Sequence, residues 1–212
     1  MQIAATDLDA LQSYKLLTGV VVPRPIAWIT TRSNEGVVNL APFSAFTYIC
    51  AKPPMIGFSC GRKNGKRKDT ANNIFANREF VVHVVDASLL DVMHESSAEH
   101  PPEVSEPDLL GLSYIPSERV DVPRLTAPGV ALECRFHDSM TLGETGAEFI
   151  VGEVLLFHVR DDLICNGKIA TATLNPVCRL GGPNYALLGP IKTLRTIAQT
   201  PQKTLGDIGE GG

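Results

Sequence analysis

Residues 129–159 read GVALECRFHDSMTLGETGAEFIVGEVLLFHV, and this stretch determines the fold class. Two long runs rich in Val, Leu, Ile and Phe, Gly129–Leu142 and Ala147–Val159, flank the segment Gly143-Glu144-Thr145-Gly146. A short connection that contains glycine between two such runs is typical of a β-hairpin. The stretch therefore predicts two long antiparallel strands.

Further runs of the same kind precede the hairpin and predict strands at Pro25–Thr31, Val37–Cys50, Met55–Cys60 and Glu79–Val85. Helices are few. We expect a short helix with Asp69 or Thr70 as its N-cap and another within Ser88–Ala98, followed by a loop over Pro101–Pro107. Strands at this frequency favour a barrel or sandwich over a doubly wound α/β sheet.

The composition is that of an ordinary globular protein. The chain has 212 residues, which favours a single domain over 1–212 with a C-terminal tail at about 196–212. Hydrophobic residues make up 44% and charged residues 20%, which excludes wholesale disorder. No apolar run reaches the roughly 18 residues of a membrane span, and the N-terminus lacks an export signal.

Several functional classes lack support in the sequence. Five cysteines, an odd number without a CxxC pair, argue against a disulfide framework or a zinc site and favour the cytoplasm. The motifs GxSxG, GxGxxG and the P-loop consensus do not occur, so serine hydrolases, Rossmann enzymes and P-loop nucleotidases have no motif support. We expect no metal ion.

The segment GRKNGKRKDT at residues 61–70 is the strongest candidate for a binding site. It places five cations between Arg62 and Lys68 in a chain of net charge −4, directly before a helix start that favours anions. The hydroxyls of Ser59 and Thr70 flank it. The segment predicts a phosphate site, with a merely solvated loop as the equal alternative. A nucleic-acid site is less favoured, because no aromatic residues interleave with the charges.

The segment NLAPFSAFT at residues 39–47 is a second candidate. Pro42 interrupts a strand, which would leave the amides of Ala41 and Ser44 free for a ligand, and the small side chains would let a flat ring approach. An ordinary edge strand with a bulge is the alternative.

Isolated residues add weaker signals. Arg24 lies between Pro23 and Pro25, which fix its direction, although a surface salt bridge would also explain it. His83 and His158 lie inside apolar strands, which favours structural histidines over ligands. Cys60 borders the basic segment and is a candidate reactive thiol.

Taken together, these pieces resemble the flavin reductase-like family. The resemblance runs from about Thr18 to Leu188, which we take as the core at 18–188. Its motifs are VPRPIAW (22–28), NLAPFS (39–44), PP (53–54) with Ser59, KDT (68–70) with Asn73, GEV (152–154) with His158, NGK (166–168) and RLGG (179–182) with Tyr185. The resemblance implies a mainly β fold, the FMN-binding split β-barrel of Greek-key type, with a few short helices.

The resemblance also implies a site, in which the cofactor carries the chemistry and no side chain is catalytic. The isoalloxazine ring would lie along β-segment 39–44, which includes Asn39, Ala41, Pro42, Phe43 and Ser44. The phosphate would be held by Ser59, Arg62, Lys68 and Thr70, although the basic run leaves open which of Arg62, Lys63, Lys66 and Lys68 reaches it. The same groove would include Arg24, Thr30, Thr31, Cys60, Asp69 and Tyr185.

The function implied by the resemblance is that of an FMN-dependent NAD(P)H:flavin oxidoreductase. NADH or NADPH would be the co-substrate, and reduced flavin would pass to a monooxygenase or another acceptor. The alternatives are a flavoredoxin-type electron carrier and a flavin-free relative that uses the groove for another ligand. The resemblance further implies a homodimer with FMN near the subunit boundary, and neither nucleic acid nor membrane as a partner.

Overall fold

The computed structural model describes residues 1–199. Of the predicted tail, residues 200–212 therefore lie outside the described residues. In the described range no helix is long and apolar enough to cross a membrane.

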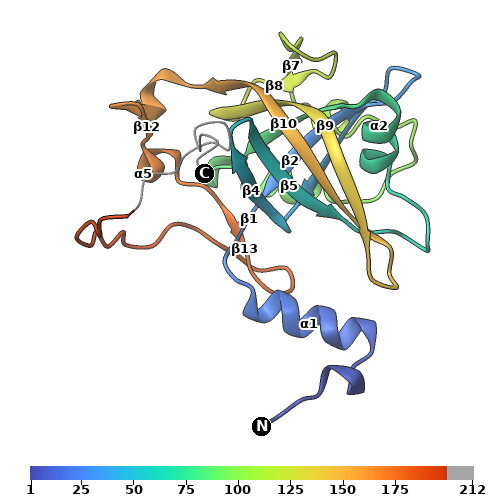
Figure 1. Cartoon of the computed structure of the whole chain (residues 1–212). Helices are drawn as coiled ribbons and strands as arrows, with labels where there is room; N and C mark the ends of the chain where they lie inside the picture. Colours follow the sequence, from blue (N-terminus) through green and yellow to red (C-terminus); the bar gives the residue numbers. More distant parts are fainter. Residues whose placement is uncertain (200–212) are drawn as a thin grey trace, which may run out of the picture.

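The centre of the molecule is one seven-stranded antiparallel sheet (Figure 1). Its strands, in spatial order, are β3 (Val38–Phe43), β2 (Ala27–Arg32), β6 (Glu79–Val84), β9 (Val130–Leu142), β10 (Ala147–Val159), β5 (Pro54–Cys60) and β4 (Phe46–Ala51). The first and last strands in this order, β3 and β4, are consecutive in the chain and joined only by Ser44 and Ala45. The sheet therefore curls round until its two edges approach each other at this corner, as in a barrel that is open along one side.

The predicted hairpin is confirmed as β9 and β10, the longest strands of the sheet. Its importance for the fold is visible at Gly152, in the GEV motif. A Cβ on Gly152 would lie 2.3 Å from Cζ of Phe80, so the absence of a side chain lets Phe80 pack over β10. Phe80 continues into an aromatic row with Phe58 and Phe43, at ring-centroid distances of 5.8 and 5.0 Å. This row fills the inside of the barrel.

A second core lies on the other face of β2. It packs Trp28 against Met93, Leu125 and Val177, and all four side chains are buried. The indole Nε1–H of Trp28 donates to Oγ of Ser96 at 2.8 Å, which ties the segment after helix α3 (Leu90–Glu95) to the sheet. Smaller elements cover this face: β7 (Tyr114–Ile115), β8 (Arg124–Leu125) and α4 (Glu106–Leu109).

The remaining elements lie around the barrel. They are η1 (Ala5–Asp7), α1 (Ala10–Val20), β1 (Arg24–Pro25), α2 (Asp69–Asn77), η2 (Ala87–Leu89), η3 (Asp161–Leu163), β11 (Ile164–Cys165), β12 (Lys168–Ile169), α5 (Thr171–Leu174), β13 (Cys178–Arg179) and β14 (Tyr185–Ala186). Strands β1, β13 and β14 form a small separate sheet.

Three sequence predictions need correction. The single strand expected over Val37–Cys50 is two strands, because the chain turns at Ser44 and Ala45. The N-cap of α2 is Lys68 rather than Asp69 or Thr70, since the Thr70 side chain is buried against β3 instead of facing the helix end. Helix α4 begins at Glu106, inside the loop expected over Pro101–Pro107. The helix expected within Ser88–Ala98 is confirmed as α3, which directly follows the 3-10 turn η2.

Helix α1 was not predicted. Its start is a capping box, in which the Asp9 carboxylate accepts from Gln12 N at 2.7 Å and the Gln12 side chain accepts from Asp9 N at 2.9 Å. None of its residues is buried, and Figure 1 shows α1 (blue) standing away from the barrel beyond β13. Its apolar side chains therefore contact solvent in the single chain.

Candidate functional site

A cavity of about 400 Å³ lies at the open corner of the barrel, beside the edge strand β3. Three parts of the chain enclose it: β3 itself, the basic loop (residues 61–68) with the start of α2, and the segment between α3 and α4. Its lining residues are Asn39, Ala41, Pro42, Lys63, Asn64, residues 66–70, residues 96–100 and Glu106. The two candidate segments of the sequence thus meet at one cavity.

The β3 wall is an edge strand, which explains how it tolerates Pro42 without losing a ladder hydrogen bond. The predicted free amide at Ala41 is not the one that leaves the ladder. Leu40 N–H points outward and donates to Oε2 of Glu106 at 2.9 Å, so alternation along the strand turns the Ala41 N–H toward β2. The small side chains of Ala41 and Pro42 leave this wall flat.

A hydrogen-bonded row of polar side chains supports the corner where β3 meets α2. The side-chain amide of Asn39 donates to Oγ1 of Thr70 at 3.0 Å and to Oγ1 of Thr31 at 3.3 Å. The Asn73 amide donates to the same Thr31 oxygen at 3.0 Å. Asn39 and Thr70 line the cavity, and Thr31 and Asn73 lie behind them. This row fixes the position of the Thr70 hydroxyl.

The basic loop does not offer all five cations to the cavity. Lys63 and Lys66 exchange backbone hydrogen bonds at 2.9 and 2.8 Å, which closes a tight turn through Asn64 and Gly65, both with positive φ. Arg62 and Arg67 both bind one oxygen of the buried carboxylate of Glu148, at 3.0 and 2.7 Å.

Arg62 is turned further from the cavity by a second contact, in which its Nε–H donates to the Gly146 carbonyl at 2.9 Å. Arg62 does not line the cavity.

Two lysines remain available to an anion. Lys63 forms an ion pair with Glu99 across the cavity, whereas Lys66 and Lys68 line it and have no carboxylate partner among residues 1–199. Lys68 is the N-cap of α2, so the first backbone N–H groups of the helix lie at the same end of the cavity as the two lysines. The Lys68 side chain makes no capping bond to them. Two cations, the Thr70 hydroxyl and a helix start thus converge on one end of the cavity.

Glu106 was missed by the sequence analysis. It is 8% exposed, lines the cavity and belongs to α4, 66 positions from the Leu40 amide that it binds. Burial raises the pKa of its carboxyl above the usual value. The Leu40 N–H, its own backbone N–H and His100 oppose that rise, and Asp69 adds to it. No local pattern in the segment around Pro107 distinguishes Glu106 from a surface glutamate.

Cys60 is not the reactive thiol that its place in the sequence allowed. It is fully buried in β5, and burial raises the pKa of its thiol to about 11, although Lys68 acts in the opposite direction. A protonated thiol is a weak nucleophile. Neighbouring Ser59 is half-buried and uses its backbone N–H for the Ala45 carbonyl at 2.8 Å.

Other residues expected in the groove lie outside this cavity. Phe43 points into the aromatic row of the core, and Ser44 lies in the turn between β3 and β4. The Thr30 hydroxyl donates to the Pro123 carbonyl at 2.8 Å on the opposite face of β2.

Arg24 and Tyr185 also lie elsewhere. The guanidinium of Arg24 donates to the carbonyls of Thr18, Val21 and Leu180 at 2.8, 2.6 and 2.9 Å, so it neither forms a surface salt bridge nor lines the cavity. The Tyr185 hydroxyl contacts Nδ1 of His94 at 2.8 Å and accepts a hydrogen bond from Arg179.

The two strand histidines are structural, as predicted. His83 is buried, accepts from Leu125 N at Nε2 and donates through Nδ1 to the Trp28 carbonyl, each at 2.9 Å. Burial lowers its pKa to about 4, so the ring is neutral at pH 7. His158 contacts the buried carboxylate of Glu133 at 2.5 Å. Among residues 1–199, no group of three or more His, Cys, Asp or Glu side chains is arranged to hold a metal ion.

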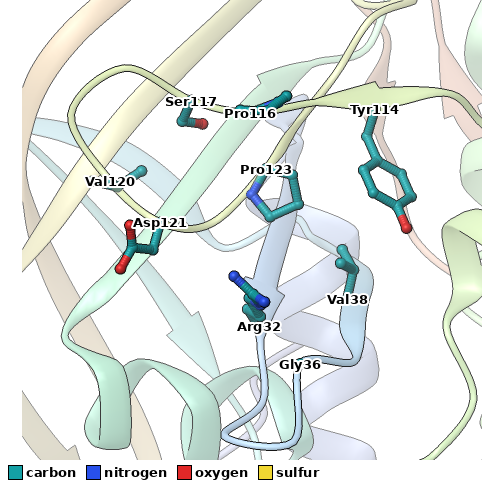
Figure 2. Close-up of a pocket in the computed structure, with 9 residues that line it drawn as sticks. All are labelled: Arg32, Gly36, Val38, Tyr114, Pro116, Ser117, Val120, Asp121 and Pro123. Carbon is teal, nitrogen blue, oxygen red and sulfur yellow. The ribbon is translucent and has the colours of Figure 1, made fainter.

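A second cavity, of about 470 Å³, lies on the other face of β2 and β3 (Figure 2). Figure 2 shows the Arg32 side chain beneath the loop that carries Pro123, between Asp121 and Val38. Arg32 is the one cation in its lining, and no residue of the basic loop reaches it. The convergence of cations, hydroxyl and helix start is therefore specific to the cavity beside β3.

The residues of the β3 cavity fit a flavin mononucleotide. Its cationic end offers donors that have no acceptor in the described chain and that suit a phosphate. Its other end is a flat strand edge with small side chains, which suits a planar ring. The carboxyl group of Glu106 also lines the cavity, bonded to the Leu40 N–H of β3.

Comparisons with known proteins agree with this chemistry. The sequence model of one family, described as a flavin reductase like domain, matches residues 19–172. An uncharacterised protein of Halalkalibacterium halodurans is 44% identical over 194 residues, which cover 89% of this chain and 93% of that protein.

Solved structures are similar over nearly the whole chain. Nitrilotriacetate monooxygenase component B from Bacillus cereus is 39% identical with a TM-score of 0.89, covering 92% of this chain and 98% of that one. The 2-nitrobenzoate 2-nitroreductase of Pseudomonas fluorescens is 32% identical with a TM-score of 0.85, covering 95% and 99%. At 19% identity and a TM-score of 0.81, a Shewanella frigidimarina protein with a split barrel domain covers 93% of this chain and all of that one, and shares the fold. The predicted split β-barrel is confirmed.

Proposed function

This chain belongs to the flavin reductase-like family, and we propose from that premise that it binds FMN and transfers a hydride from NADH or NADPH to flavin. The observation that carries the proposal is the convergence of Lys66, Lys68, the Thr70 hydroxyl and the start of α2 on one end of a cavity whose other wall is β3. The reduced flavin then serves a second protein. The similarity to nitrilotriacetate monooxygenase component B supports that role.

FMN, when bound, supplies the hydride-accepting ring, so the protein needs no nucleophile of its own. The side chains bind and orient. Lys66 and Lys68 hold the phosphate by charge, and the Thr70 hydroxyl, fixed by Asn39, adds a directional hydrogen bond. The edge of β3, with the small side chains of Ala41 and Pro42, would support the flavin ring, and a nicotinamide would have to reach the ring from the cavity. The buried, protonated Cys60 takes no part.

The assembly that we propose is a homodimer. Helix α1 exposes Tyr14, Leu17 and Val20 at 61%, 60% and 74%, although it lies next to the loop at Gly181 of its own chain. An apolar helix face of this kind is typical of an interface between subunits. The five free cysteines are compatible with the cytoplasm, where we expect the protein to act.

A spectroscopic titration tests the function. FMN added to the purified protein should bind saturably, and the quenching of flavin fluorescence measures this binding. Adding NADH or NADPH in the absence of oxygen should bleach the flavin absorbance, and each protein molecule should reduce many molecules of free FMN supplied in excess. Failure to bind FMN would refute the proposal, and binding without NAD(P)H turnover would favour the flavoredoxin-type carrier.

A second candidate is direct reduction of a small acceptor by the bound flavin. The similarity to a 2-nitrobenzoate 2-nitroreductase favours it. The two candidates differ in what they need: a nitroreductase consumes NAD(P)H with a nitroaromatic acid and catalytic amounts of FMN, whereas a flavin reductase requires FMN as a stoichiometric acceptor. Measuring NADPH consumption with each acceptor separates them.

A further inference from the structure

Glu106 bridges two parts of the cavity wall that are remote in the sequence. It begins helix α4, whose N-cap Ser105 accepts from Asp108 N at 3.4 Å, and Pro107 follows it at the start of the helix. From there the side chain reaches β3, where Oε2 accepts the outward Leu40 N–H at 2.9 Å. This bond fixes the carboxyl group beside the strand edge that lines the cavity.

The second oxygen of the carboxyl group is not bound by any other residue of the described chain. Oε1 of Glu106 accepts no hydrogen bond from another residue within 1–199, and the only further donor to the carboxyl group in that range is the backbone N–H of Glu106 itself. Oε1 is not one of the fully buried unpaired polar atoms of residues 1–199, so it keeps some exposed surface. Because Glu106 is 8% exposed and lines the cavity, the surface that Oε1 retains opens into that cavity. One oxygen is therefore anchored and the other is presented to a ligand.

Charged side chains surround the Glu106 carboxyl group on the basic loop, on α2 and on the segment between α3 and α4. Asp69 on α2 and Glu99 after α3 are negative, and Lys63, Lys66 and Lys68 of the basic loop are positive. His100 lines the same cavity, and Asp108 lies one helical position beyond Pro107 on α4 itself. Burial is the dominant influence on the pKa of Glu106 and raises it. Glu106 therefore holds its proton more tightly than an ordinary glutamate does.

We propose that Glu106 is a positioning residue for the flavin ring, which in its neutral form donates a hydrogen bond from Oε1 to a ring carbonyl or nitrogen beside β3. This rests on the proposed function. A neutral carboxyl group suits this place because the ligand brings its own negative phosphate into the same cavity of about 400 Å³. Ionisation of Glu106 removes the donor and adds a like charge, so it weakens flavin binding.

Substitution by glutamine provides the test. In Glu106→Gln the amide oxygen can still accept the Leu40 N–H, and the amide N–H₂ donates into the cavity at every pH. The variant therefore imitates the neutral carboxyl group permanently. Affinities for FMN are measured by fluorescence titration from pH 5 to pH 8 for both proteins. Since the ionisation of the FMN phosphate affects both equally, it cancels in the ratio of the two dissociation constants.

We expect that ratio to be lowest at pH 5 and to rise with pH, to about tenfold in favour of the variant at pH 8, which is the effect of one hydrogen bond and its charge. Asp108→Asn removes a carboxylate from the same helix outside the cavity, and its ratio to the wild type should stay flat. Glu106→Ala loses both bonds and should bind more weakly at every pH. If the alanine variant fails to fold, the pH dependence of the ratio between wild type and Glu106→Gln still tests the inference.

The outcomes separate this inference from the function on which it rests. A wild-type protein that does not bind FMN overturns both. If the wild type binds FMN and the ratio of its dissociation constant to that of Glu106→Gln does not change with pH, the proposed function stands. Glu106 then only accepts the Leu40 N–H of β3, and the inference is wrong. A ratio that changes in the opposite direction shows that the ionised carboxylate is the favoured form and also overturns the inference.

Discussion

Glu148 decides which cations of the basic loop are available. Its carboxylate is 2% exposed and binds both Arg62 and Arg67, so these two arginines neutralise a buried charge. An arginine that leaves such a pair exposes an unpaired buried carboxylate, which is costly. The open question of which cation reaches the phosphate therefore has a physical answer: the lysines without carboxylate partners in the described chain, Lys66 and Lys68, are the better candidates.

The first prediction concerns Lys68 and Thr70. Replacing both by alanine should weaken FMN binding by about 1.5–3 kcal/mol, the scale of charge-assisted hydrogen bonds, while riboflavin binding changes little because riboflavin has no phosphate. Fluorescence titration with both ligands measures the difference. Lys52→Ala, which removes an exposed lysine outside the cavity, is the control. Equal losses for FMN and riboflavin would contradict a phosphate role.

At the scale of elements, the connection between α1 and the barrel depends on Arg24. Its guanidinium donates to carbonyls at the end of α1 and in the loop after β13, where Leu180 lies 156 positions from Arg24, and so joins these two segments. The backbone on either side is stiffened by Pro23 and Pro25, as the sequence indicates. The same arginine that the family resemblance places in the cofactor groove thus acts as a structural clamp in the single chain.

The second prediction follows from that clamp. Arg24→Ala should loosen α1, because three carbonyl groups lose their donors, and should leave the FMN dissociation constant within about twofold. Hydrogen exchange of residues 10–20 should become faster, with the exchange of β9 and β10 as an internal reference. A large loss of FMN affinity with unchanged exchange in α1 would instead support a direct contact between Arg24 and the cofactor.

At the scale of the whole molecule, helix α1 carries several exposed apolar side chains close together. In addition to Tyr14, Leu17 and Val20, the helix exposes Leu11 and Leu16. A helix with no buried residue gains little from packing on its own chain, and short isolated helices are marginal in water. Association with a second copy would bury this face, which supports the proposed homodimer.

The third prediction tests the interface. Leu17→Glu together with Val20→Glu should shift the protein from dimer to monomer, because the two carboxylates would be buried unpaired. Light scattering coupled to size exclusion gives the mass in solution. The control is Leu109→Glu, which places the same charge on another exposed leucine, 58% exposed on α4. An unchanged dimer in the double variant would exclude α1 from the interface.

The sequence by itself determined the β architecture, the long hairpin and two of the three segments that enclose the cavity. These follow from hydrophobic runs, glycine turns and charge clustering, which are local properties of the chain. The sequence does not predict the turn at Ser44 and Ala45, because neither residue is a strong turn former. It also gives no prediction of helix α1, although the capping box at its start is a local signal.

Only the tertiary structure decided which partner each buried charged side chain binds. Glu106 meets Leu40 across 66 positions, and Glu148 meets Arg62 across 86. Such contacts depend on how the barrel closes rather than on neighbouring residues. Burial then sets their chemistry, because it makes an unpaired charge costly. It therefore fixes which cations are paired and raises the pKa of the Glu106 carboxyl group.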